Sequence, residues 1–131
     1  MSITPAWYFR AAVLYALAAM ALGLHMGLSG VHDQVAAHAH VNLVGWVSIF
    51  LYGAFLKLHP GSNGRLSAIL WITANAGILI MAAGLLILYS GNVPLGDPLA
   101  GIGSIVTILG MALFTVIVYR ATDRAAPPIP N

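Results

Sequence analysis

The stretch from Gln34 to Leu58 reads QVAAHAHVNLVGWVSIFLYGAFLKL, and it decides the fold of this chain. Nearly all of its residues are apolar, and Lys57 is the one Lys, Arg, Asp or Glu within it. About 20 such residues in a row carry an α-helix across the hydrocarbon core of a bilayer. The stretch is therefore predicted to be a transmembrane helix, with two histidines near its start.

Three further apolar runs have the same length and character. They cover Ala6–Leu28, Leu66–Ser90 and Pro98–Arg120. The links between the four runs are short and contain glycine or polar turn-forming residues, which is typical of tight turns between antiparallel neighbours. These links are Ser29–Asp33, His59–Arg65 and Gly91–Asp97. The predicted fold class is an all-α membrane protein with four transmembrane helices.

The composition of the whole chain agrees with this prediction. Of its 131 residues, 60% are hydrophobic and only 6% are charged, and the mean hydropathy is +0.93. So few charged residues cannot cover the surface of a soluble domain. We expect a single transmembrane domain over residues 1–124, followed by a flexible Pro-rich tail over residues 125–131.

The distribution of charge predicts the orientation of the helices in the membrane. With four spans, both termini and the second link lie on one side, and that side carries every basic residue: Arg10, Lys57, Arg65, Arg120 and Arg124. The other side carries Asp33 and Asp97. By the positive-inside rule, the N-terminus and the C-terminus are both predicted to be cytoplasmic. The basic residues are scattered at helix ends and form no patch, so a nucleic-acid partner is not expected.

Missing residue types exclude several classes of site. The chain has no cysteine, which excludes thiolate metal sites, iron–sulfur clusters and covalent c-type haem attachment. It has no glutamate, and its acidic residues all lie near predicted membrane ends, so a buried carboxylate proton relay is excluded. The catalytic constellations of hydrolases are absent as well. A metal or haem would need nitrogen or oxygen ligands, for which the five histidines are the main source.

His38 and His40 are the strongest candidate ligands. If the helix begins near Gln34 with Asp33 as its N-cap, both residues lie roughly 6 to 9 Å below the outer rim of the apolar layer. An imidazole placed there is costly and is by default a functional hypothesis. Positions i and i+2 of an α-helix are about 200° apart, so the rings point to opposite faces and cannot chelate one ion. Two separate pockets are implied, or one pocket shared between neighbouring molecules.

Three further residues are candidates in the same region, each with a structural alternative. His25, near the outer end of the first span, is placed to enter either pocket. Asn42 follows the first histidine of the pair by one turn, where it would hold the imidazole in one tautomer or join helices by hydrogen bonds. Trp46 follows by two turns and would pack against a cofactor or against a helix. His32 and His59 are expected to be solvated turn residues.

Small and polar residues inside the spans have a structural interpretation of their own. Glycine is frequent there, and small residues let transmembrane backbones approach closely. Some of these glycines would equally leave room for a flat cofactor. Asn75, in the middle of the third run, is expected to join helices by hydrogen bonds.

The residues His38-Ala39-His40-Val41-Asn42-Leu43-Val44-Gly45-Trp46, with Tyr52-Gly53-Ala54-Phe55 and His59-Pro60, resemble one helix of the catalytic subunit of haem–copper oxidases. The likeness is strongest to the C-type cytochrome c oxidases and looser to the nitric oxide reductases. It covers residues 38–60, and the two histidines with Gly-Trp are its specific part. In that family the first histidine binds a high-spin haem and the second a low-spin haem. The resemblance therefore implies haem b as the cofactor of this chain.

The resemblance also implies an assembly. The oxidase subunit consists of three arcs of four helices about a pseudo-threefold axis, with histidine ligands mainly on the second helix of each arc. This chain resembles one such arc. Three copies would then form a homotrimer in which His38 of one copy and His40 of the next hold a haem across each interface. The expected location is the bacterial inner membrane, with the histidine site toward the periplasm.

Departures from the family limit the activity that the resemblance implies. The chain has no His-His pair for a copper site, no tyrosine placed to couple to such a histidine and no acidic proton channel. It is oxidoreductase-like but lacks a full oxygen-reducing site, and whether it is an enzyme stays open. Haem binding is the expected function, and bis-histidine ligation would favour electron transfer. The sequence identifies no redox partner.

Two other functions stay open at this point. The chain would bind copper or zinc near the outer surface, using His25, His38 or His40 together with residues of a partner. Alternatively, it is a non-catalytic accessory or assembly subunit whose histidines only make hydrogen bonds.

Overall fold

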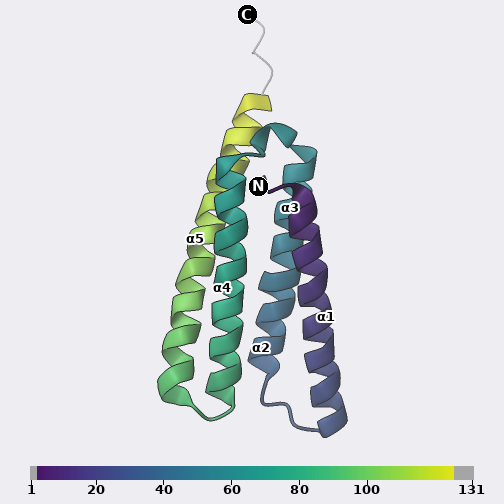
Figure 1. Ribbon diagram of the computed structural model, residues 1–131, viewed down its shortest axis with the longest axis vertical. Coiled ribbons are helices and arrows are strands. Elements are labelled where there is room, and N and C mark those ends of the chain that lie inside the picture. The colour runs from purple at the N-terminus through teal and green to yellow at the C-terminus, as the bar shows by residue number, and fades with distance from the viewer. Residues whose placement is uncertain (1–2, 126–131) are drawn as a thin grey trace, which may run out of the picture.

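Four helical rods run antiparallel in the structure, a computed structural model that describes residues 3–125 (Figure 1). The first rod is α1, the second is built from three consecutive elements, and the third and fourth are α4 and α5. The bounds are α1 Pro5–Ser29, α2 Val35–His40, η1 Val41–Ser48, α3 Ile49–Leu58, η2 Pro60–Ser62, α4 Arg65–Tyr89 and α5 Val93–Ala125. Here η1 is a π-helix and η2 is a single 3₁₀ turn.

Each rod is long and apolar enough to cross a membrane. The four candidate spans are Pro5–Ser29, Val35–Leu58, Arg65–Tyr89 and Val93–Asp123. The turns that follow α1 and α4 lie at one end of the molecule, and η2 lies with the last turns of α5 at the other (Figure 1). Over residues 3–125 the prediction of an all-α fold with four helices long and apolar enough to span a membrane is confirmed.

The start of the second rod differs from the prediction in its cap. The helix begins at Val35, its N-cap is Gln34 rather than Asp33, and no side chain caps it by a hydrogen bond. The Gln34 side chain instead reaches across to α4, where its amide nitrogen donates to the carbonyl of Leu86 at 3.4 Å and to Ser90 Oγ at 3.3 Å. The Asp33 cap was therefore wrong, because a contact between rods positions this turn.

The start of α5 also differs, by five residues. Gly91–Asp97 was expected to be a link with the helix beginning at Pro98, but α5 begins at Val93 and contains Pro98. Asn92 Oδ1 accepts a hydrogen bond from the Leu95 N–H at 3.3 Å, which caps the new start. Gly96 lies so close to α4 that a Cβ there would be 2.3 Å from the Leu88 nitrogen. This early turn is helical because it packs on α4.

The C-terminal end is only partly described. α5 continues to Ala125, so the first residue of the predicted tail is helical. Residues 126–131, which hold the rest of the predicted Pro-rich tail, lie outside the described residues. The division into a domain over 1–124 and a tail over 125–131 stays a prediction.

Glycines allow the rods to pack closely, as the packing interpretation predicts. Between α4 and α5, a Cβ on Gly84 would lie 2.2 Å from the Ala100 nitrogen, and one on Gly103 would lie 2.2 Å from the Met81 nitrogen. Real side-chain atoms do not approach backbone that closely, so only glycine fits at either position. Gly27, by contrast, has nothing within 4 Å of its Cβ position.

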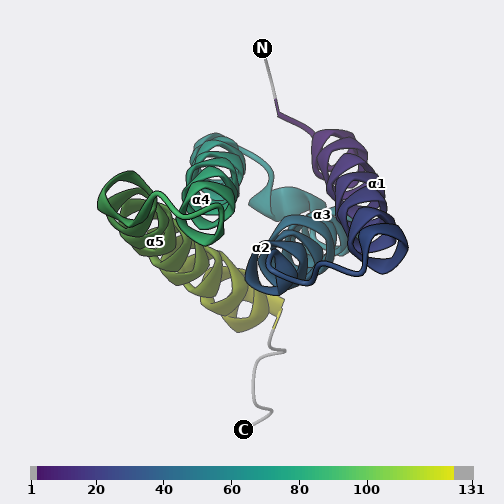
Figure 2. The same ribbon diagram turned by 90° about the horizontal axis from the view of Figure 1, so that it is seen from below.

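The main cluster of buried side chains extends from the η2 end to the middle of the molecule. It is formed by side chains from α1, α3, α4 and α5: Tyr8, Ala12, Ile49, Tyr52, Leu56, Leu70, Ala74, Ile78, Met81 and Ile117. The Tyr8 hydroxyl donates to the Ser67 carbonyl and so joins α1 to α4. In Figure 2 the rods form two hairpins, and α5 slants so that its C-terminal end comes close to the second rod. The tilted contact between the Tyr52 and Phe114 rings, with centroids 4.5 Å apart, is part of this approach.

Candidate functional site

His38 and His40 lie in the last turn of α2 and point in different directions. His38 is half-buried and faces α1, whereas His40 is exposed. This arrangement agrees with the separation of about 200° expected for positions i and i+2 of an α-helix. The two imidazoles therefore have different surroundings and different hydrogen-bond partners.

His38 has both ring nitrogens engaged. Its Nδ1 lies 2.9 Å from the carbonyl oxygen of Ala19 in α1, and its Nε2 lies 3.2 Å from the amide nitrogen of Asn42. A carbonyl only accepts, so Nδ1 carries the proton and donates it, while Nε2 accepts from Asn42. The ring also fits against Gly23, where a Cβ would be 2.8 Å from His38 Cε1. His38 thus links the first two rods.

Asn42 is the partner that orients the His38 ring. Its amide nitrogen contacts both Nε2 and the backbone carbonyl of His38, each at 3.2 Å. Both contacts lie within the same rod, so Asn42 is not joining two helices through them. The hydrogen bond that would select one tautomer is present, while a role of Asn42 toward a cofactor stays a prediction.

His40 has one ring nitrogen that is hydrogen-bonded and one that is unpaired within the described residues. Its Nδ1 donates to the carbonyl of Ala36, one turn earlier in the same helix, at 2.7 Å. Within the described residues Nε2 has no hydrogen-bond partner, and the side chain is exposed. A ring held in this way keeps the lone pair of Nε2 available. That is the form in which neutral histidine binds metals and haem iron.

The remaining candidates are not gathered around this pair. His25 is exposed and follows Gly23 by two residues, so it points away from the α1 face that meets His38. Trp46 is 37% exposed and is not part of the buried core. Within residues 3–125 no group of three or more His, Cys, Asp or Glu side chains is placed to hold a metal ion. The structure brings His38 together with Asn42 and leaves His40 and His25 apart.

A π-helix begins directly after His40, and the sequence analysis did not predict it. η1 covers Val41–Ser48, and its wider turns pair residues five apart. Ser48 Oγ donates to the carbonyl of Leu43, also five residues earlier, at 2.8 Å. The one buried residue of η1 is Gly45, which packs against the Tyr15 ring. π-helical turns are rare overall, but those that occur are often at functional sites. The position of η1 therefore points to this part of the second rod as a candidate functional site.

A pair of polar side chains joins α1 to α4 near the middle of the molecule, on the η2 side of the histidines. Tyr15 in α1 donates to Asn75 Oδ1 in α4 at 3.0 Å, and Asn75 Nδ2 donates to the carbonyl of Trp71 at 2.8 Å. Asn75 therefore joins two helices, as predicted. The pair fixes α1 against α4, and α1 in turn carries the Ala19 carbonyl that holds His38.

Comparison with protein-family models, with curated proteins and with solved structures found no match for this chain. What it does must be inferred from its own residues and their geometry.

Proposed function

We propose that this protein binds b-type haem at its membrane-embedded surface, where His40 would hold the iron. The observation that carries the proposal is the state of the His40 side chain. Its Nδ1 is bound to the Ala36 carbonyl at 2.7 Å, and its exposed Nε2 has no partner among the described residues. An unpaired polar nitrogen facing hydrocarbon is costly. Coordination to iron would remove that cost.

We propose that His38 supplies the second iron ligand. Its Nδ1 bond to the Ala19 carbonyl is the outer bond that a ligating histidine keeps, since it orients the ring and raises its basicity. Its Nε2 would exchange the Asn42 hydrogen bond for iron. These two imidazoles are donors that suit haem iron. His40 Nε2 is unpaired in this conformation, whereas His38 Nε2 would become available only if the Asn42 amide moved away. Bound haem would supply a one-electron redox couple, and two axial histidines favour electron transfer over ligand activation.

The oligomer proposed is a homotrimer with haem shared between copies. Because His38 and His40 face different ways, one chain does not direct both rings at one iron. A heterologous contact between copies that closes as a ring would bring His38 of one copy and His40 of the next together. Haem-loaded protein that ran as a strict monomer in detergent would contradict the shared site.

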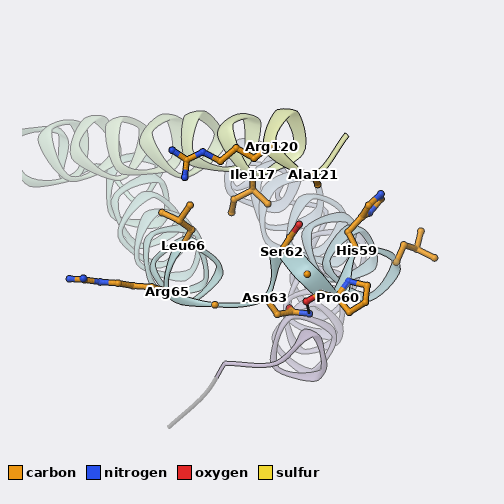
Figure 3. Close-up of a pocket in the computed structure, with 12 residues that line it drawn as sticks. His59, Pro60, Ser62, Asn63, Arg65, Leu66, Ile117, Arg120 and Ala121 are labelled. Carbon is orange, nitrogen blue, oxygen red and sulfur yellow. Dashed lines mark hydrogen bonds between the residues drawn. The ribbon is translucent and has the colours of Figure 1, made fainter. Parts of the chain in front are cut away.

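The orientation proposed places the histidines toward the periplasm of a bacterial inner membrane. Arg65 and Arg120 lie at the η2 end of the molecule, and Asp33 lies at the opposite end, beside α2 (Figures 1 and 3). Basic residues favour the cytoplasmic side. His38 and His40 then lie in the outer half of the bilayer.

A reduced-minus-oxidised visible spectrum of the purified protein tests the haem proposal. Wild-type protein is expected to show sharp b-type bands, and H40A and H38A are each expected to lose them because each removes an axial ligand. The matched control is H32A, which removes an exposed turn imidazole and is expected to leave the bands unchanged. Bands that survive both H38A and H40A would contradict the assignment. Colourless protein carrying stoichiometric copper or zinc would favour the metal-binding alternative, and colourless metal-free protein would favour an accessory subunit.

A further inference from the structure

A cavity opens at the end of the molecule opposite the histidine pair. It lies between the η2 turn, the start of α4 and the last turns of α5, and its volume is about 520 Å³. That volume falls within the range of about 300–1,000 Å³ typical of ligand sites. Its wall includes two arginines, Arg65 and Arg120, and none of its lining residues is acidic.

The polar part of the cavity suits a phosphate group. Arg65 and Arg120 are both exposed, and in Figure 3 the Arg120 side chain lies near Leu66 while the Arg65 side chain points outward. Binding of one phosphate by both guanidinium groups would therefore require the exposed Arg65 side chain to turn toward Arg120. Ser62 comes from the turn between them, and its hydroxyl points toward α5 (Figure 3). Guanidinium groups bind phosphate through paired hydrogen bonds, and a hydroxyl adds one more donor.

The turn that forms the cavity floor is held in shape by its own hydrogen bonds. Asn63 Nδ2 donates to the carbonyls of Leu56 and Pro60, each at 3.2 Å. Ser67 Oγ accepts from the Gly64 N–H at 2.9 Å and donates to the Gly64 carbonyl at 2.8 Å. The turn is therefore ordered before any ligand arrives, which lowers the entropic cost of binding.

The apolar part of the cavity distinguishes a lipid from a soluble phosphate compound. Leu58, Leu66 and Ile117 also line the cavity, and Leu58 is 77% exposed at the very end of its span. Apolar side chains at this depth would meet acyl chains, while the arginines lie at the level of the headgroups. A free phosphate ion would gain nothing from these leucines.

We propose that this cavity binds the phosphate of an anionic phospholipid. Arg65 and Arg120 bind the phosphate, Ser62 donates a hydrogen bond to it, and Leu58 contacts the first part of an acyl chain. Neither His38 nor His40 lines this cavity. The lipid proposal is therefore independent of the haem proposal.

Native mass spectrometry of the full chain in detergent, with phosphatidylglycerol or phosphatidylcholine added, tests the proposal. Wild-type protein is expected to retain phosphatidylglycerol preferentially, and R120Q is expected to lower that retention about tenfold by removing a paired charged contact. The matched control is K57Q, because Lys57 is an exposed cation at the same end but outside the cavity. Equal losses in R120Q and K57Q would show attraction to surface charge alone and would overturn the site.

A second pair of variants tests the cavity without changing charge. A121W fills it, since Ala121 is one of its lining residues, whereas T122W places the same ring on the exposed neighbouring position. Only A121W is expected to lose phosphatidylglycerol, and equal behaviour of the two variants would overturn the proposal. Circular dichroism confirms that each variant is helical. Displacement of the lipid by millimolar inorganic phosphate would identify a soluble phosphate compound as the ligand and would overturn the lipid assignment.

Discussion

At the scale of single residues, His38 and His40 are chemically different although they are two positions apart. His38 has a donor and an acceptor bond, to Ala19 and Asn42, and is half-buried between two rods. His40 has one bond, to its own helix, and is exposed. We therefore expect His38 to contribute to the stability of the fold and His40 not to.

Unfolding of the cofactor-free protein by a denaturing detergent, followed by circular dichroism, tests this difference. H38A is expected to lower the free energy of unfolding by about 0.6–1.7 kcal/mol, the range found for hydrogen bonds between membrane helices. H40A is expected to change it by less than about 0.5 kcal/mol, as is usual for exposed positions. Equal effects of the two variants would contradict the hydrogen bonding described for His38.

The residue scale also shows how far the sequence predicts the site. The spacing of His38 and His40 was sufficient to predict opposite faces, because positions two apart on any α-helix are separated by about 200°. The Ala19 carbonyl as the partner of His38 was not predictable. That contact depends on how closely α1 approaches at Gly23, and this approach is a property of tertiary packing.

At the scale of elements, hydropathy predicted which segments form the four rods. It did not predict the first residue of each helix or the presence of a π-helix. The α5 start at Val93 was missed because Pro98 was taken as the first helical residue, whereas the Asn92 cap and the contact of Gly96 with α4 support an earlier start. The π-helix over Val41–Ser48 was missed because no residue type in it distinguishes a π-turn from an α-turn. The face presented by Trp46 depends on that winding.

Glycine substitutions between α4 and α5 test the close packing of these two elements. G84A is expected to lower the free energy of unfolding by about 1–3 kcal/mol, because its new Cβ would lie 2.2 Å from the Ala100 nitrogen and the backbones must separate. The matched control is G101A on α5, where nothing lies within 4 Å of the new Cβ. Alanine is the better helix former, so G101A is expected to be neutral or slightly stabilising. Thermal unfolding in detergent measures both, and a G84A protein as stable as the wild type would contradict the packing described.

At the scale of the whole molecule, the outer surface of the four rods is strongly apolar. Leu14, Leu24, Leu43 and Ile108 are each more than 60% exposed. A patch of this extent on a soluble protein would cause aggregation, whereas in a bilayer it faces acyl chains or other copies of the chain. The apolar surface therefore supports a membrane location. It does not indicate the direction of insertion, which we infer from the distribution of charged residues.

Labelling of introduced cysteines tests the proposed orientation. The chain has no cysteine of its own, so G61C in the η2 turn and H32C in the α1–α2 turn each provide a single thiol. Both positions are exposed, and neither substitution disturbs packing. A membrane-impermeant maleimide is expected to label H32C in spheroplasts and G61C only after lysis. The reverse pattern would contradict cytoplasmic termini.

The contacts between the two hairpins have a mechanical consequence for the histidine pair. Toward the η2 end Tyr52 contacts Phe114 and Tyr8 donates to Ser67, while toward the other end α2 and η1 pack on α4. The Gln34 hydrogen bonds to the end of α4 lie at that same end. Because both ends are joined, one hairpin cannot rotate against the other without breaking contacts. The element that carries the two imidazoles is therefore held in place against α4.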